Sequence, residues 1–160
     1  DVELMDGTIS ENIARFATVD PEQVVAAARM AGVHDIILRL PQGYDTAIQG
    51  GGHMLSAGQQ QRLGLARALY GNPKLVVLDE PNSNLDIAGD QALLEALVQL
   101  KRQGKTVIVV THRNNLLQLV DKILLLVDGQ VNAFGPRDEV LAQLSNPQAA
   151  RPANQGVVAK

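Results

Sequence analysis

The chain has 160 residues, of which 46% are hydrophobic and 19% are charged, and its net charge is −3 at pH 7. These proportions are typical of a globular protein and exclude wholesale disorder. The acidic balance argues against nucleic-acid binding, which usually requires a basic face. The absence of cysteine excludes a disulfide scaffold and thiolate metal sites.

Hydrophobicity also limits what the chain can do at a membrane. The longest uninterrupted apolar runs, such as Ile123 to Val127, have five residues, whereas a helix that crosses a bilayer needs about 20. No signal-peptide pattern is present. Because the chain opens with Asp1 rather than methionine, we expect an internal or truncated segment whose upstream part is missing.

Capping patterns predict helices in the first third of the chain. Thr8 with Glu11 three residues later is a capping box, which predicts a helix to about Phe16. Asp20, followed by proline, predicts the start of a second helix that stops at Gly32. A short helix is expected over about residues 35–40 and a glycine-rich loop over residues 49–52.

The remainder of the chain has the pattern of an α/β protein. Ser56 with Gln59 is another capping box and predicts a helix to about Tyr70. Apolar runs at residues 75–78 and 107–110 show no alternation, so they predict strands of a parallel sheet that is buried on both faces. A helix over about residues 87–103 lies between them, which makes a β–α–β unit.

The last part of the chain is predicted to hold a hairpin and a helix. Residues 123–127 and 131–134 flank Asp128 and Gly129, a pattern typical of a hairpin, which we place at the sheet edge. A short helix is expected over about residues 137–144. The tail, residues 145–160, is rich in Pro, Ala, Asn and Gln and is expected to be frayed.

Polar residues follow both predicted parallel strands. In open α/β sheets, ligands bind beyond the carboxyl ends of the strands. Asp79 and Glu80 end the first strand and His112 ends the second. One carboxylate could hold Mg²⁺ and the other could deprotonate an attacking water, while an imidazole could contact a phosphate oxygen or that water. The ordinary alternative is a solvated pair of acids and a lone surface histidine.

The segment from Leu55 to Gln59 is the sharpest signal in the chain. A serine N-cap followed by small residues leaves the first amide groups of a helix accessible, and the helix dipole favours an anion there. An ordinary N-cap is the simpler alternative, but it does not explain why Gly58 lies in the first turn, where glycine is unfavourable. Asp86, in the stretch SNLD, also fits an ordinary helix N-cap.

Together these motifs, in order and spacing, resemble the ATP-binding cassette (ABC) family over about residues 1–144. LSAGQ resembles the family signature, LVVLD the Walker B strand, SNLD the D-loop and the final TH the switch histidine. The resemblance implies ATP and Mg²⁺ as cofactors, with Asp79 as a metal ligand, Glu80 as the catalytic base and His112 beside it. It also assigns the ATP-contacting residues, which are Ser56, Ala57, Gly58, Gln59 and Asp86.

The same resemblance implies a fold and a division into domains. The fold would be α/β, a partial P-loop NTPase (RecA-like) core with a parallel sheet and an N-terminal helical subdomain. Residues 1–54 would be part of the helical subdomain, residues 55–144 the second half of the catalytic core, and residues 145–160 a flexible tail.

A finer resemblance concerns the subfamily. DGTISENIARF is similar to the exporter type of cassette, and LRLPQGYDT and DEPNSNLD are similar to ATPases of type I secretion systems that export proteases and lipases. This implies a head-to-tail homodimer of nucleotide-binding domains at the cytoplasmic face of the bacterial inner membrane. Its partners would be the transmembrane domain of the same exporter, a periplasmic adaptor (membrane fusion protein), an outer-membrane channel and a secreted protein, with no nucleic acid.

The sequence departs from the family pattern at several positions, and these departures leave alternative functions open. The Walker A loop, GxxxxGK[ST], and the Q-loop glutamine are absent from the sequence. Ala57 stands where the family usually has Gly, and Gln60 stands where it often has Arg. Gly50 stands where exporters often carry an acidic residue. We therefore expect ATPase activity in the full-length protein and none in this segment alone. The alternatives are a soluble, non-transport ABC ATPase of the DNA-repair or translation type and a non-catalytic module.

Overall fold

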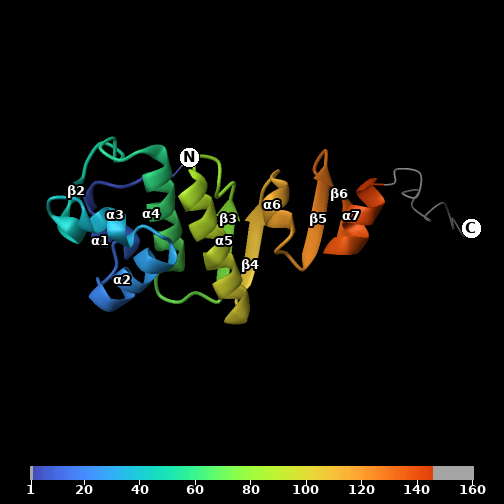
Figure 1. Ribbon diagram of the computed structural model, residues 1–160, viewed down its shortest axis with the longest axis horizontal. Helices are drawn as coiled ribbons and strands as arrows, with labels where there is room; N and C mark the ends of the chain where they lie inside the picture. Colours follow the sequence, from blue (N-terminus) through green and yellow to red (C-terminus); the bar gives the residue numbers. More distant parts are fainter. Residues whose placement is uncertain (1, 146–160) are drawn as a thin grey trace, which may run out of the picture. The chain divides into compact units, whose positions relative to one another are not determined.

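The computed structural model describes residues 2–145, which form two compact units that divide between His112 and Arg113. The elements of the first unit are β1 (Gly7–Thr8), α1 (Ile9–Ile13), α2 (Pro21–Met30), α3 (His34–Leu38), the 3₁₀ helix η1 (Gly43–Asp45), β2 (Ala47–Ile48), α4 (Ala57–Leu69), β3 (Leu75–Asp79), α5 (Ile87–Arg102) and β4 (Thr106–Val110) (Figure 1). Those of the second are α6 (Asn114–Leu117), β5 (Lys122–Val127), β6 (Gln130–Pro136) and α7 (Arg137–Ser145).

The predicted caps of the first two helices are confirmed. The backbone N–H of Glu11 donates to Oγ1 of Thr8 at 3.1 Å, and the N–H of Thr8 donates to the Glu11 carboxylate at 2.7 Å, which completes the capping box of α1. Helix α1 ends at Ile13 rather than near Phe16, because Arg15 and Phe16 adopt left-handed φ angles of 59° and 58° that no α-helix accommodates.

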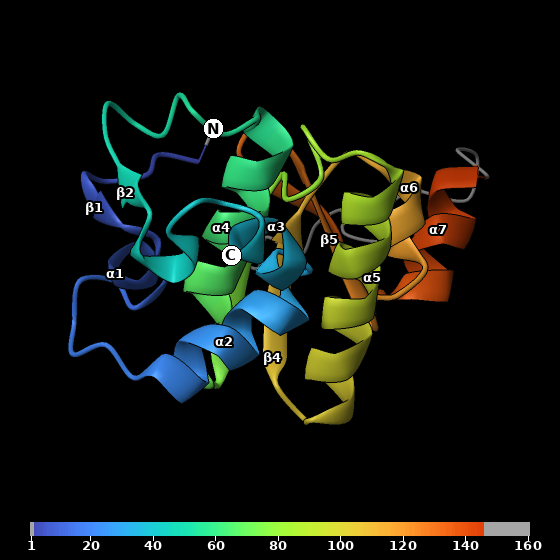
Figure 2. The same ribbon diagram turned by 60° about the vertical axis from the view of Figure 1, so that its left-hand side comes forward.

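Helix α4 is the central element of the first unit. It packs against α1 and α2 on the side of the helical segments and also contacts β3, and Figures 1 and 2 both show the short helices gathered beside it. A core of apolar side chains in this helical part is almost fully removed from solvent. They include Leu4, Ile9, Ile13, Val24, Ala28, Val33, Ile37, Ile48 and Leu63. Burial of this aliphatic cluster is the main driving force that fixes α4 in position.

Strands β3 and β4 pair in parallel, as predicted, in a register that sets Leu75 against Thr106 and Asp79 against Val110. The prediction that both faces of these strands are buried is wrong for the described residues. Val76 is 2% exposed, whereas its neighbour Val77 is 58% exposed. The reason is that exposure alternates along both strands. Helix α4 packs against β3 and α5 against β4, while the face that holds Val77 is left exposed among the described residues.

The hairpin of the second unit is also confirmed. Strands β5 and β6 pair antiparallel, and Asp128 and Gly129 between them have φ angles of 50° and 76°, as a tight two-residue turn requires. Among the described strands, β5 and β6 pair with each other, and the place of this hairpin at the edge of the parallel sheet stays a prediction. Helix α7 contacts both strands and begins at Arg137, as expected.

Two domain predictions remain open. The boundary between residues 54 and 55 does not coincide with the division after His112 and stays a prediction. Residues 146–160 of the predicted tail lie outside the described part of the chain.

Short elements that the sequence pattern did not indicate are β1 and β2, which pair antiparallel, and α6.

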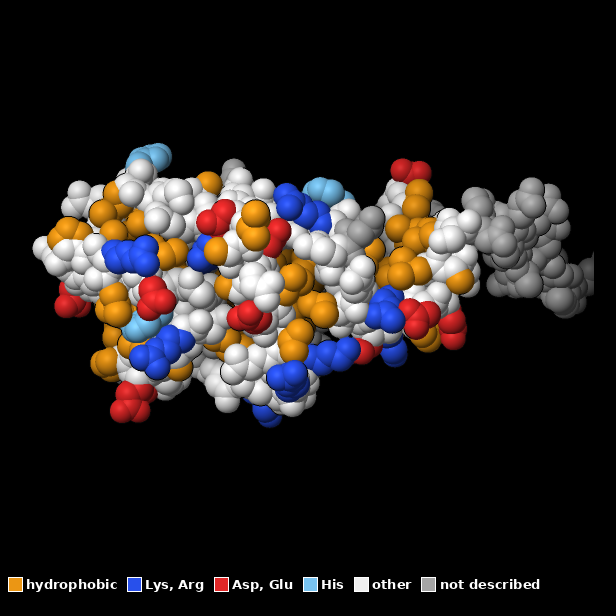
Figure 3. All heavy atoms as spheres, in the orientation of Figure 1, with side chains coloured by type: hydrophobic (Ala, Val, Ile, Leu, Met, Phe, Trp, Pro, Cys, Tyr) orange, Lys and Arg blue, Asp and Glu red, His pale blue; other side chains and the backbone are white. Residues whose placement is uncertain are grey.

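Surface character agrees with the composition. On the face that Figure 3 presents, basic and acidic side chains of the first unit are interspersed, and no stripe of a single charge is visible. Within residues 2–145, no helix combines the length and the hydrophobicity needed to span a bilayer.

Candidate functional site

Parallel pairing brings the ends of β3 and β4 together and with them two of the predicted site residues. The backbone N–H of Glu80 donates to the carbonyl of Val110 at 2.8 Å, which extends the pairing by one residue. Nδ1 of His112 lies 2.8 Å from Oε1 of Glu80. The His112 side chain is 79% exposed and that of Glu80 34%. The acid–imidazole pair that the sequence predicted therefore exists, and it faces an open surface.

Glu80 holds an unusual backbone conformation. Its φ is 44°, in the left-handed region that non-glycine residues rarely enter. One carboxylate oxygen, Oε1, contacts His112, while the other, Oε2, is buried without a hydrogen-bond partner among the described residues. An unpaired buried carboxylate oxygen is costly, so Oε2 has an unfilled need for a hydrogen-bond donor that the described residues do not supply. Asp79 precedes it at the strand end and is exposed.

The acid pair fits one type of metal site. No group of three or more His, Cys, Asp or Glu residues capable of holding a metal occurs in residues 2–145. A site made of protein ligands alone is therefore not formed by the described residues. Mg²⁺, however, is often held by one or two carboxylates together with substrate phosphates and waters. The exposed Asp79 carboxylate beside Glu80 fits that incomplete donor set.

The start of α4 has the predicted capping box. The N–H of Gln59 donates to Oγ of Ser56 at 3.3 Å, and the N–H of Ser56 donates to Oε1 of Gln59 at 2.9 Å. The amides of Ser56 and Gln59 are thus engaged within the capping box. Ser56 and Ala57 are exposed, so the tip of the helix, with its partial positive charge, remains accessible to an anion.

Gly58 has a packing role that the sequence did not reveal. A Cβ atom on Gly58 would lie 2.9 Å from the backbone oxygen of Asn84. The loop after β3 therefore approaches the first turn of α4 too closely for any side chain at this position. This contact accounts for a glycine in a helical turn without reference to a ligand, and contact of Gly58 with a phosphate stays a prediction.

Asp86 is the N-cap of α5, which is the ordinary role that the sequence also allowed. Its Oδ1 accepts from the N–H of Gly89 at 2.8 Å and from the guanidinium of Arg62. The Gly89 N–H, and secondarily Arg62, hold the pKa of the Asp86 carboxyl below its usual value. Arg62 also donates to the carbonyl of Gly32 at 3.2 Å, so a single side chain on α4 joins the end of α2 to the start of α5.

The predicted residues fall into two groups that do not touch directly. Among the described residues, no hydrogen bond or ion pair joins Ser56 to Glu80 or His112. The link between the groups runs through Gln61, whose Nε2 donates to the Glu80 carbonyl at 2.9 Å.

Sequence reasoning missed Gln61 and Arg62. Both are buried, at 8% and 9% exposure. Neither gave a signal, because polar residues on an amphipathic helix usually mark its solvated face. Gln60, noted earlier only as a departure from the family, donates to the carbonyls of Gly52 and Leu55 at 2.9 and 3.2 Å and so ties α4 to the glycine-rich loop.

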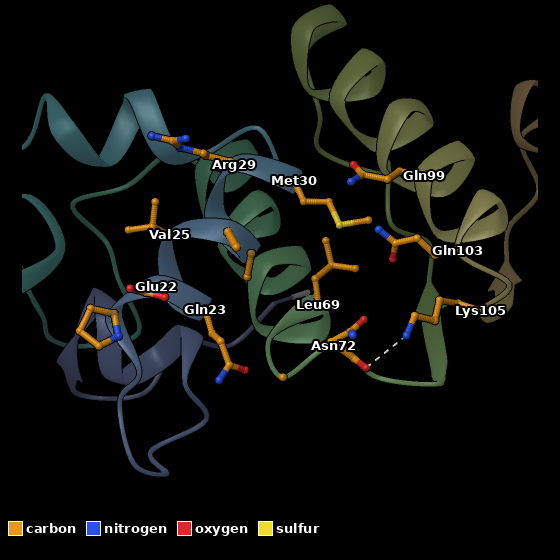
Figure 4. A pocket seen from close by; sticks show the side chains of 14 residues that line it. Glu22, Gln23, Val25, Arg29, Met30, Leu69, Asn72, Gln99, Gln103 and Lys105 are labelled. Atoms are coloured by element: carbon orange, nitrogen blue, oxygen red, sulfur yellow. Dashed lines mark hydrogen bonds between the residues drawn. The ribbon is translucent and has the colours of Figure 1, made fainter.

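A separate hollow lies at the other end of the helical segments. Figure 4 shows Met30 of α2 facing Leu69 and the end of α5. On its rim, Nζ of Lys105 donates to the carbonyl of Asn72 at 3.4 Å. None of the residues predicted for the functional site lines this hollow, so it is not part of that site.

Comparisons with known proteins agree with this geometry. Residues 2–83 match the family model described as ABC transporter. Over 149 residues the chain is 58% identical to the type I secretion system ATP-binding protein PrsD of Rhizobium meliloti, which covers 92% of this chain and 26% of that protein. It is 42% identical over 143 residues to an ATP-dependent lipid A-core flippase of Chromohalobacter salexigens, covering 89% of this chain and 24% of that protein.

A solved structure supports the same relationship at the level of the fold. A bacterial Atm1-family ABC exporter with ATP bound superposes with a TM-score of 0.79 and 34% identity, over 96% of this chain and 28% of that one. The α/β fold of the chain is thus that of the ABC type, a partial P-loop NTPase core. The chain spans about a quarter of the length of the relatives that it matches.

Proposed function

The chain belongs to the ABC transporter family, and on this basis we propose that it is the signature-to-switch segment of the ATPase of an ABC exporter. In the whole protein this segment would bind and hydrolyse ATP to drive transport. The observation that carries the proposal is the 2.8 Å contact between Glu80 and His112 at the ends of paired parallel strands. This contact brings the proposed base next to an imidazole, which supports a role for the pair in holding an attacking water.

Each site residue has a role in this proposal. Oε2 of Glu80, which has no hydrogen-bond partner among the described residues, would accept the proton of the attacking water. His112 would hold the carboxylate through Oε1 and present its exposed ring to the terminal phosphate. Asp79 would serve as a ligand of Mg²⁺, which neutralises phosphate charge when it is bound.

The tip of α4 would act in the partner's site. Its accessible first turn at Ser56, Ala57 and Gly58, with Gln59, is suited to the outer oxygens of a phosphate. In a head-to-tail homodimer, two-fold symmetry makes each protomer complete the other's site. Asp86 would then connect the two sites, because the loop that it ends packs against the first turn of α4.

The degree of similarity to relatives with different transport functions supports a proposal for the transport class. Identity to the type I secretion protein is 58%, against 42% to the lipid A-core flippase and 40% to several putative multidrug exporters. On this basis we propose that the whole protein acts in protein secretion. Protease- or lipase-type cargo is proposed only from the resemblance of LRLPQGYDT and DEPNSNLD to exporters of that kind. The partners of the whole protein would be its own transmembrane domain, a periplasmic adaptor and an outer-membrane channel, and it would act at the cytoplasmic face of the bacterial inner membrane.

Substitution of Glu80 by Gln in the whole protein tests the catalytic part of the proposal. The variant should bind ATP and accumulate as an ATP-bound dimer, with turnover reduced by about 100-fold or more because the proton acceptor is lost. Size-exclusion chromatography with ATP and a phosphate-release assay measure the two effects. Normal turnover would show that Glu80 is not the base.

Three experiments separate the proposal from its alternatives. The coding sequence upstream of Asp1 should encode several apolar spans of about 20 residues, whereas a soluble ABC ATPase of the DNA-repair or translation type would have none. Deletion of the gene should abolish secretion of an extracellular protein. Failure of the full-length protein to bind nucleotide would favour the non-catalytic module.

A further inference from the structure

Gln61 makes contacts that no other side chain of α4 makes. Its side chain is buried and points to the loop that follows β3. Its Nε2 donates to the carbonyl of Glu80 at 2.9 Å and to Oγ of Ser83 at 3.2 Å, and its Oε1 accepts from the N–H of Asn84 at 2.9 Å. The side-chain amide of Gln61 therefore binds both ends of the segment from Glu80 to Asn84.

Gln61 thus binds Glu80, which has the least favourable backbone conformation in the site. A left-handed non-glycine residue persists only where its surroundings hold it, and Glu80 has a φ of 44°. Its N–H donates to Val110 at 2.8 Å, and its carbonyl accepts from the N–H of Ser83 at 3.2 Å and from Gln61. Gln61 is the one side-chain group among these three partners.

We propose that Gln61 is a positioning residue that holds Glu80 in its left-handed conformation and so aims the carboxylate at His112. The inference rests on the proposed function and deepens it, because it concerns the geometry of the proposed base. Rotation of the Glu80 backbone out of the left-handed region would swing its side chain away from the 2.8 Å contact with His112. Gln61 does not touch the reacting atoms, so it acts only through Glu80.

The proposal also links the two parts of the site within one protomer. Gln61 lies on the same helix as the serine-led tip, and its amide is the direct hydrogen-bonded connection from that helix to the Glu80 carbonyl. A shift of α4 when its tip engages an anion would therefore act on the backbone of the base.

The test uses the whole protein and two substitutions of Gln61. Gln61→Glu keeps the acceptor for Asn84 but replaces the donor to Glu80 with a carboxylate oxygen, which repels the carbonyl. Gln61→Met keeps the length of the side chain and removes both functions. Gln91→Ala is the matched control, because Gln91 is an exposed glutamine on α5 whose Nε2 donates only to Glu95 among the described residues.

We expect both Gln61 variants to lower kcat by about 10- to 100-fold, the scale on which a misplaced catalytic group acts. The KM for ATP should stay within about 2-fold, since a positioning defect that spares ground-state binding lowers kcat alone. Gln91→Ala should behave as wild type. A raised KM with unchanged kcat, or wild-type kcat in both Gln61 variants, overturns the proposal.

A double-mutant cycle separates positioning from a merely structural role. If Gln61 acts through Glu80, then Gln61→Met should lower turnover no further in a Glu80→Gln background, whereas general damage to the fold would lower it again. A further loss in that background overturns the proposal. Normal turnover in Glu80→Gln alone would instead refute the assignment of the base, so failure of the inference and failure of the proposed function give different results.

Discussion

Nδ1 of His112 lies 2.8 Å from Oε1 of Glu80 although the two residues follow different strands. The contact is a consequence of register, because parallel pairing sets Asp79 against Val110 and each strand then continues to its polar residue. The sheet thus brings the two residues to the same edge, where their side chains can meet. Removal of either side chain should act on the chemical step more than on the fold.

Substitution of His112 by Ala in the whole protein should lower the kcat for ATP hydrolysis by about 100-fold, the lower range for a group that assists proton transfer. The thermal unfolding temperature should change little, because the side chain is 79% exposed. Steady-state kinetics and calorimetry measure the two effects. His53→Ala, at an exposed histidine of the glycine-rich loop, is the control. Wild-type kcat in the His112 variant would contradict the role.

Gly58→Ala should destabilise the chain through a backbone collision. The new Cβ would lie 2.9 Å from the oxygen of Asn84, and because a backbone atom cannot rotate away, the loop or the helix must shift. Overpacking of this kind costs about 1–3 kcal/mol. Urea denaturation followed by circular dichroism measures the loss.

The matched control for Gly58→Ala is Ala57→Ser. Ala57 is exposed in the same turn of α4, so this change should stay within about 0.5 kcal/mol of wild type. Equal stability of the Gly58→Ala variant and wild type would show that Asn84 does not hold this loop against the helix.

Local elements were largely predictable because their causes are local. Thr8 and Ser56 each lie three residues before an acid or amide, and both form the expected capping boxes. Asp79, Glu80 and His112 could be placed at strand ends because each follows an apolar run. The hairpin turn at Asp128 and Gly129 depends only on two residues that tolerate positive φ.

What could not be predicted depends on contacts between distant segments. Gln61 and Arg62 look like solvated helix residues until the loop after β3 and the end of α2 are placed beside them. Gly58 resembled a ligand contact, whereas the approach of Asn84 already requires a glycine there. The burial of Val77 was overestimated because an apolar run does not show whether other elements cover both faces of a strand.

Asp20, the N-cap of α2, should make stability depend on pH in the acid range. Its carboxylate accepts from the side chain of Gln23 at 2.7 Å and from the backbone N–H groups of Gln23 and Glu22. Led by the Gln23 side chain, these bonds hold the pKa of Asp20 below its ordinary value of 3.8. A lowered pKa means that the stabilisation is complete above that ordinary value and is lost as pH falls through the folded-state pKa.

Asp20→Ala should therefore be less stable than wild type at neutral pH, and the difference should shrink as pH falls below about 3.8. Asp20→Asn keeps a cap oxygen without a titrating group and should lack this part of the pH dependence. Urea titrations of the three proteins between neutral and strongly acidic pH measure the effect. A difference between wild type and Asp20→Ala that is constant with pH would contradict it.

The 160-residue chain by itself should show no ATPase activity that depends on Glu80. Catalysis requires the γ-phosphate to be held against the base, and in this family a glycine-rich loop with a lysine supplies that cradle. No GxxxxGK[ST] stretch occurs in the sequence, so the contact between Glu80 and His112 would face a phosphate that nothing on this chain retains. A phosphate-release assay on the purified chain, with Glu80→Gln as the matched control, should give the same background rate for both. Turnover that Glu80→Gln abolishes would refute this expectation and would require another phosphate-binding element within the segment.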